Sequence, residues 1–155
     1  MERRSQFLRE RWEERARSEH AERTPQEEQR EADIMLYLDI KKQAREGGAH
    51  LQGLLVAVER QAVRYRMTVN IWERSRRESI DTKALDAFGE AEQNRRFAHN
   101  VLMDDVNILS RQCAAVGLDN EWRRRIGLER DDVGRWGLAV AQLIYRKFED
   151  DHHEH

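Results

Sequence analysis

The sequence has few residues that interrupt helices or link segments covalently: one proline, eight glycines and one cysteine among 155 residues. Without a second cysteine, Cys113 cannot form an intramolecular disulfide. Its place on an apolar helical stripe indicates a buried side chain rather than a reactive thiol. The scarcity of proline and glycine favours an all-α fold. A chain of this length can bury enough surface to form one domain without covalent staples.

The sequence also lacks long hydrophobic runs, because none approaches the roughly 20 residues that a membrane-spanning helix needs. The longest apolar runs, 34–38 and 54–58, are of the size found in protein cores. One free cysteine and the lack of a signal peptide indicate a reducing compartment. We therefore expect a cytoplasmic protein with no membrane partner.

Neither sign of charge is in large excess, since charged residues make up 37% of the chain while the formal net charge is −2. The basic surplus typical of proteins that bind duplex nucleic acid is therefore missing. A Gly-rich phosphate loop, a Gly-x-Ser-x-Gly elbow and a Cys-x-x-Cys pair are also missing. We expect no cofactor, and the absence of these signatures favours a non-enzymatic protein over an enzyme.

The N-terminal part predicts two helical segments. Residues 1–23 are mostly charged, with a narrow apolar stripe around Trp12, which predicts a solvated helical arm or an arm that packs on a second subunit. The next helix begins at Thr24-Pro25-Gln26-Glu27, which combines a capping box with proline at the first helical position. The pair Gly47-Gly48 ends that helix.

Two long amphipathic patterns follow, with apolar residues at spacings of three and four. The first runs from His50 to beyond Trp72, and the second runs from Thr82 to Val116. Residues 79–82 offer only a short turn between them, so the two helices must form an antiparallel hairpin over about residues 50–116.

The C-terminal part predicts a short helix after Asp119 and a last helix that opens at Asp131 or Asp132. Gly134 and Gly137 are costly inside a helix, which indicates close approach of another helix at these positions. The predicted organisation is a charged arm (1–23), a bundle domain (24–149) and a polar tail (150–155). The whole is an elongated antiparallel helical bundle built on the hairpin. Its expected core comprises Leu54, Val58, Tyr65, Val69, Trp72, Phe88, Leu102, Val106, Leu109, Trp136, Val140 and Ile144.

The inward stripe of the second hairpin helix becomes polar between Glu92 and Asn100. Arg95 and His99 share the face of the core residues, with Arg96 and Asn100 beside them. One interpretation is a structural polar layer, in which these side chains hydrogen-bond across the bundle to Glu59, Glu73 or Tyr65 and fix the helix register.

The segment Asn94-Arg-Arg-Phe-Ala-His-Asn100 also resembles the R-N-x-x-x-H signature of the HEPN helical-bundle superfamily, many of whose members are RNases. The resemblance implies a metal-independent RNase in which His99 acts on a ribose 2′-hydroxyl or a leaving oxygen. It further implies that Arg95 or Arg96 holds phosphate, with Asn100 beside them. The slot five residues before the histidine is occupied here by Asn94, whereas the two arginines stand four and three residues before it.

A second basic cluster comprises Arg123, Arg124, Arg125 and Arg130, close to Trp122 and Trp136. Such a cluster could hold RNA phosphates and stack bases, but interleaved acidic residues make a salt-bridged surface around two core tryptophans the competing interpretation. Dedicated metal ligands are not expected. The tail residues His152, His153 and His155 offer only weak, adventitious binding to a transition ion.

Two functional hypotheses follow. The first is a non-enzymatic interaction or scaffold module that self-associates or binds a helical protein partner, because two long helices in a small chain leave apolar stripes that one domain does not cover. The second is a HEPN-like RNA-binding or RNA-cleaving domain. A helical subunit that coats RNA in a ribonucleoprotein would be its binding-only form.

Overall fold

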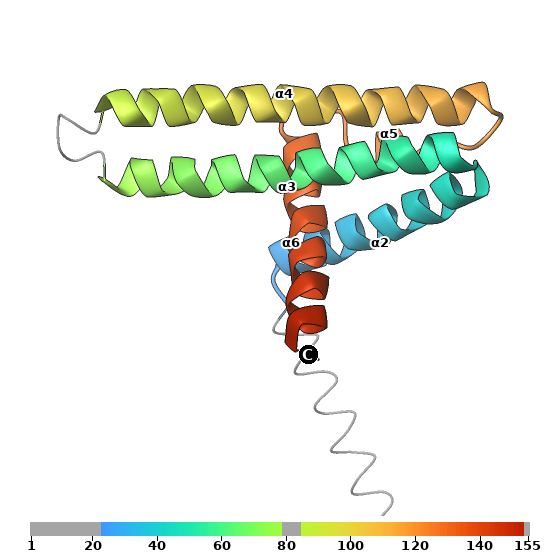
Figure 1. Ribbon diagram of the computed structural model, residues 1–155, viewed down its shortest axis with the longest axis horizontal. Coiled ribbons are helices and arrows are strands. Elements are labelled where there is room, and N and C mark those ends of the chain that lie inside the picture. Colours follow the sequence, from blue (N-terminus) through green and yellow to red (C-terminus); the bar gives the residue numbers. More distant parts are fainter. Residues whose placement is uncertain (1–22, 79–84, 154–155) are drawn as a thin grey trace, which may run out of the picture. The chain divides into compact units, whose positions relative to one another are not determined.

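The computed structural model describes residues 23–78 and 85–153, and within these ranges every regular element is a helix (Figure 1). The all-α prediction is therefore confirmed. The predicted arm falls almost wholly outside the described residues, as does the predicted turn at 79–82. The described residues form five helices: α2 (Pro25–Glu46), α3 (Ala49–Glu78), α4 (Leu85–Ala115), α5 (Trp122–Ile126) and α6 (Asp132–His153).

A boundary between two compact units falls inside α2, between Ala32 and Asp33. In the first unit, the backbone N–H of Glu27 donates to Thr24 Oγ1 at 3.2 Å, which confirms the predicted N-terminal cap of α2. The other end of α2 lies in the second unit, where Gly48 has a φ of +94°. A left-handed backbone there costs glycine least, so the predicted stop is also confirmed.

Helices α3 and α4 lie side by side and antiparallel, as the hairpin prediction requires (Figure 1). Two ring contacts mark their register: Trp72 near the end of α3 meets Phe88 near the start of α4, and Tyr65 meets His99 further along. Helix α4 ends where the backbone N–H of Leu118 donates to the carbonyl of Cys113 at 2.9 Å. The intervening Gly117 has a φ of +78°, as expected of a helix C-terminus.

Helix α6 crosses the hairpin instead of lying along it (Figure 1). The crossing is close because Gly137 has no side chain: a Cβ atom there would stand 2.6 Å from Leu102 Cδ2 and 3.9 Å from Ala62 Cβ. The sequence-based expectation of close helix approach at Gly137 is confirmed. Helix α6 also continues to His153, into the segment predicted to be a polar tail.

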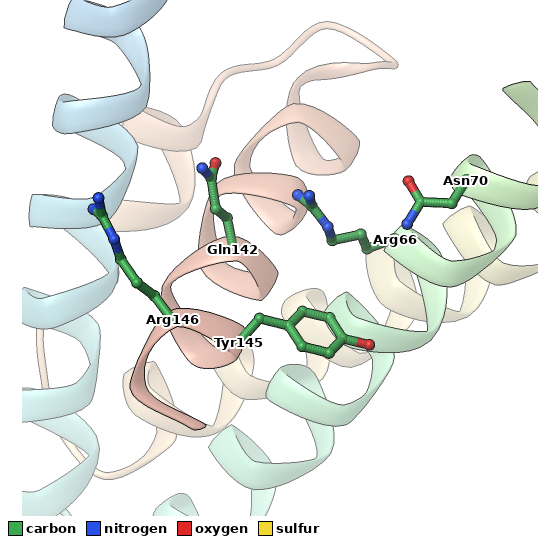
Figure 2. Close-up of a pocket in the computed structure, with 5 residues that line it drawn as sticks. All are labelled: Arg66, Asn70, Gln142, Tyr145 and Arg146. Atoms are coloured by element: carbon green, nitrogen blue, oxygen red, sulfur yellow. The ribbon is translucent and has the colours of Figure 1, made fainter. Parts of the chain in front are cut away.

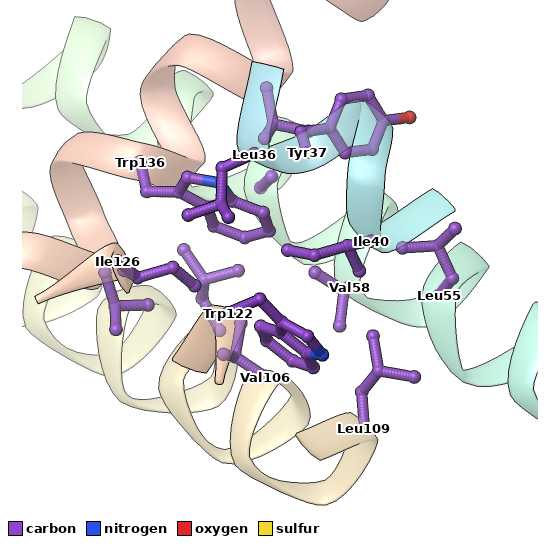
Figure 3. Close-up of a cluster of buried hydrophobic side chains, with 14 of the residues drawn as sticks. Leu36, Tyr37, Ile40, Leu55, Val58, Val106, Leu109, Trp122, Ile126 and Trp136 are labelled. Atoms are coloured by element: carbon purple, nitrogen blue, oxygen red, sulfur yellow. The ribbon is translucent and has the colours of Figure 1, made fainter. Parts of the chain in front are cut away.

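The core gathers side chains from all five helices (Figure 3). The rings of Tyr37 and Trp136 meet edge-on, with 6.4 Å between their centroids. Of the expected core, five residues are only partly buried: Leu54, Val69, Trp72, Phe88 and Ile144. Fully buried residues that the expected core did not include are Ile40, Leu51, Ile126 and Val133. Cys113 is buried, as predicted.

A buried ion pair joins α2 to α6, and no sequence pattern indicated it. The Asp33 side chain is almost fully buried, and its two carboxylate oxygens accept from Arg135 Nε at 3.1 Å and from an Arg135 terminal nitrogen at 3.3 Å. Arg135 also donates to Asp132 and to the carbonyl of Ile126, each at 2.8 Å. Burial by itself would lower the pKa of Arg135, but the bonds and charges of the two aspartates raise it above its usual value.

None of the helices in the described ranges is both long and apolar enough to cross a lipid bilayer.

Candidate functional site

A polar layer lies where α3, α4 and α6 meet, and it contains Tyr65, His99 and Gly134. Tyr65 and His99 are each 7% exposed, and their ring centroids are 5.6 Å apart with a tilt of 56°. A Cβ atom on Gly134 would stand 2.9 Å from Tyr65 Oη and 3.0 Å from His99 Cδ2. Gly134, where the sequence predicted the close approach of another helix, therefore leaves room for the side chains of Tyr65 and His99.

The enclosure of His99 favours the neutral form of its imidazole. Its Nε2 atom is buried and has no hydrogen-bond partner among the described residues. Burial lowers the pKa of His99, and the nearby charges of Arg95 and Arg130 lower it further. The charge of Asp131 and a hydrogen bond with Asn100 oppose this shift but do not cancel it. A buried, neutral imidazole suits packing against a tyrosine ring better than proton exchange with a ligand in solution.

The Arg95 side chain contacts an aromatic and an acidic side chain within the hairpin. Its guanidinium carbon lies 4.8 Å from the centroid of the Trp72 ring, a cation–π contact, and a terminal nitrogen lies 3.8 Å from Glu92. Burial raises the pKa of Tyr65, while a hydrogen bond from Arg95 and its positive charge oppose the rise. Arg95 therefore links the polar layer to the outer end of the hairpin.

The other two residues of the HEPN-like segment face solvent. Arg96 is exposed and pairs with Glu92 at 3.2 Å, one turn earlier on the same helix. Asn100 is also exposed. The structure thus brings Arg95 and His99 to one side of α4, near Tyr65, and places Arg96 on another side. The catalytic role that the resemblance implies stays a prediction.

Glu59, Glu73 and Tyr65 were the alternative partners predicted for this layer, and among the described residues it is Tyr65 that receives a hydrogen bond, from Arg95. Glu59 instead accepts a hydrogen bond from the hydroxyl of Tyr37, and Glu73 is exposed. Burial raises the pKa of Tyr37, and the bond and charge of Glu59 raise it further. The reason is geometric: Glu59 lies on the side of α3 that faces α2, whereas His99 approaches α3 from α4.

In the second basic cluster, one arginine is partly buried and the other three are exposed. Arg123 donates to Asn107 Oδ1 at 2.7 Å and to the carbonyl of Gly127 at 3.2 Å, and burial lowers its pKa despite the nearby charge of Asp132. Arg124, Arg125 and Arg130 are exposed to solvent. Binding of RNA by these three arginines stays a prediction.

The two tryptophans beside this cluster, Trp122 and Trp136, are buried. Their rings are therefore closed to bases, as the interpretation of a surface around two core tryptophans expects. Among the residues that the structure describes, no group of three His, Cys, Asp or Glu side chains could hold a metal ion. The side chains of His152, His153 and His155 are not among those that the structure describes.

A cleft that sequence reasoning missed lies between α3 and α6 (Figure 2). It has a volume of about 400 Å³ and is lined by Arg66 and Asn70 from α3 and by Gln142, Tyr145 and Arg146 from α6. The spacing of four residues within each pair, 66 with 70 and 142 with 146, predicts a shared helix face. Nothing in the sequence indicated that these two faces meet.

Comparison with known proteins adds no relative. No family model matches the chain, and neither the curated proteins nor the solved structures include a match. The fold and the sites therefore define only a class: an all-α helical bundle with a buried polar layer at its helix crossing and an open cationic cleft beside it.

Proposed function

We propose that this protein is a non-enzymatic interaction module that self-associates through the outer face of α4. The observation that carries the proposal is Phe97, which lies in the middle of a long helix and is 68% exposed. Val101 and Ile108 follow it by one and three turns and lie on the same face. We refer to Phe97, Val101 and Ile108 as the outer stripe.

The outer stripe is poorly suited to remain in water. Ile108 is exposed and Val101 is partly exposed, so the three side chains form an apolar stripe on a helix whose opposite face is already buried in the core. The exposed Asp104 interrupts this stripe between Val101 and Ile108. Covering such a row removes apolar surface from water at about 25 cal/mol per Å². An apolar row on an otherwise charged surface supports an interface rather than a solvated face.

A second copy of the chain matches this row by symmetry. In an antiparallel twofold pairing of two α4 helices, an axis midway between Phe97 and Ile108 brings Phe97 of each copy opposite Ile108 of the other. Each aromatic ring then fills the space beside a β-branched side chain, and no additional partner is required. Val101 and Asp104 lie equally close to the axis in this arrangement, so Val101 of each copy faces Asp104 of the other.

The enclosure of His99 supports a module that binds rather than one that cleaves. The imidazole is closed off from solvent, and Arg95 is engaged with Trp72. These contacts are those of a layer that stiffens the hairpin and so presents the outer stripe on a rigid surface.

The test compares Phe97→Ser with Leu128→Ser by sedimentation velocity over a wide range of protein concentration. Leu128 is a matched control because it is 85% exposed and lies outside α4, between α5 and α6. The wild type and Leu128→Ser should form dimers that dissociate on dilution, and Phe97→Ser should remain monomeric. Circular dichroism should show equal helix content in all three.

A wild type that is monomeric at every concentration would refute the proposal. Equal dimerisation of Phe97→Ser and Leu128→Ser would refute the assignment to the outer stripe.

A further inference from the structure

We propose that the cleft between α3 and α6 binds a phosphate-bearing small molecule of nucleotide size. The cleft is lined by Arg66, Asn70, Gln142, Tyr145 and Arg146. Each of these side chains carries a hydrogen-bond donor, and none of them is a carboxylate. A surface that offers donors and positive charge, with no negatively charged side chain in its lining, is complementary to the oxygens of a phosphate group.

No side chain that the structure describes neutralises the charge of the two guanidinium groups of the cleft. Among the side chains that the structure describes, neither Arg66 nor Arg146 forms an ion pair or a hydrogen bond, although acidic residues outnumber basic ones in the chain by 30 to 28. By contrast, Arg96 and Arg135 each have a carboxylate partner. Two cations that share one cleft without a lining carboxylate repel each other, and an anion between them relieves that repulsion.

The cleft lies beside the close crossing of α3 and α6. Ala62 of α3 touches the position of Gly137 on α6, and Arg66 follows Ala62 by one turn. Gln142 follows Gly137 by five residues on α6. The distance between the two walls is therefore set by the tight helix crossing, and ligand binding does not have to order a loop.

The remaining lining groups suit a base beside the phosphate. Figure 2 shows the Gln142 amide between the two guanidinium groups, with Asn70 and the Tyr145 ring on the Arg66 side. Tyr145 is partly exposed, so one ring face can stack on a base, and the two amides can bond to base edges. A cleft of about 400 Å³ is within the usual range for small-molecule sites, which supports a nucleotide over a bare phosphate ion.

The test is an NMR titration of the full chain that follows the side-chain amides of Asn70 and Gln142 and the Nε–H groups of the arginines. Separate samples receive inorganic phosphate, adenosine 5′-monophosphate, adenosine and sodium sulfate. The monophosphate should shift Arg66, Arg146 and the two amides in one saturable process, and should bind more tightly than phosphate or adenosine.

Substitutions then assign the contacts. Arg66→Gln and Arg146→Gln should each weaken binding of the monophosphate about tenfold, as expected for the loss of a charge-assisted hydrogen bond. Arg64→Gln is the matched control, because Arg64 is an exposed arginine on the same helix outside the cleft. Tyr145→Phe should keep the affinity, whereas Tyr145→Leu should lower it.

Three outcomes would overturn the proposal. One is the absence of saturable shifts at Arg66 and Arg146 up to millimolar monophosphate. Another is sulfate binding as tightly as the monophosphate, which would indicate general anion attraction. The third is equal weakening by Arg64→Gln and Arg66→Gln.

Discussion

Gly134 of α6 lies against the side chain of Tyr65 of α3, so closely that a Cβ atom at position 134 would stand 2.9 Å from the tyrosine Oη. The same atom would stand 3.0 Å from Cδ2 of His99. The absence of one methyl group therefore sets how near α6 comes to the hairpin. It also closes the polar layer from the side of α6.

The first prediction concerns that methyl group. Gly134→Ala should lower the free energy of unfolding by about 1–3 kcal/mol, because a rigid tyrosine ring and an imidazole must move to make room. Gly53→Ala is the matched control, since a Cβ atom at position 53 in α3 would meet nothing within 4 Å. It should stabilise the protein by about 0.5–1 kcal/mol through its helix propensity and the lower entropy of the unfolded chain.

Urea unfolding followed by circular dichroism measures both changes. Adding Tyr65→Phe to Gly134→Ala should recover part of the loss, because it removes the nearest atom. If Gly53→Ala and Gly134→Ala changed the free energy of unfolding equally, the close approach of Gly134 to Tyr65 and His99 would be contradicted.

The second prediction concerns the ion pair between Asp33 and Arg135. Arg135→Met should lower the free energy of unfolding by about 2–3 kcal/mol, because it takes two guanidinium bonds from a buried carboxylate. The expected loss of stability is smaller than for a fully buried ion pair, because the Arg135 side chain is partly exposed. Arg124→Met, at an exposed position on α5, should change stability by less than about 0.5 kcal/mol.

A double-mutant cycle separates the pair from its surroundings. Asp33→Leu combined with Arg135→Met should cost less than the sum of the two single changes, because neither charge is then left behind. Strictly additive losses would show that the two side chains do not interact.

The third prediction concerns pH. Because burial lowers the pKa of His99, the unfolded chain binds a proton at this residue near pH 6.5 while the folded chain does not. The free energy of unfolding should therefore fall as the pH is lowered through about 6.5, by at most about 1.4 kcal/mol per pH unit for this group. The fall stops below the pKa of the folded state.

His99→Phe keeps a ring at this position and removes the titrating group. Urea unfolding at several pH values between 5 and 8 should show that the difference in stability between wild type and His99→Phe changes across this range. His50→Gln, at an exposed position, provides the control for the loss of a histidine side chain. A constant difference between wild type and His99→Phe would contradict a neutral, buried His99.

The fourth prediction addresses the RNase hypothesis. Because His99 is closed off from solvent, wild type and His99→Ala should leave a mixed RNA pool equally intact, as judged on a denaturing gel. Arg96→Ala serves as a second comparison, because Arg96 is the arginine of the segment that reaches solvent. Cleavage by the wild type that is lost in His99→Ala would instead establish the HEPN-like function.

Much of the local structure could be predicted from short-range signals. Thr24 caps α2, Gly48 ends it, and Gly117 ends α4, because caps and left-handed turns depend on residues within a few positions of one another. The periodic apolar residues predicted the two long helices, and their antiparallel arrangement followed from the short turn expected between them. The cost of glycine inside a helix correctly predicted that α6 would be approached closely at Gly134 and Gly137.

The tertiary structure alone decided which distant faces meet. Asp33 and Arg135 are 102 residues apart, and Arg66 and Arg146 come from helices that no sequence pattern pairs. Helical periodicity tells which side of a helix is apolar, but it carries no information about the angle at which another helix crosses that side. That angle is set by side-chain packing around Gly134 and Gly137. It is also what encloses His99 and opens the cationic cleft one turn away.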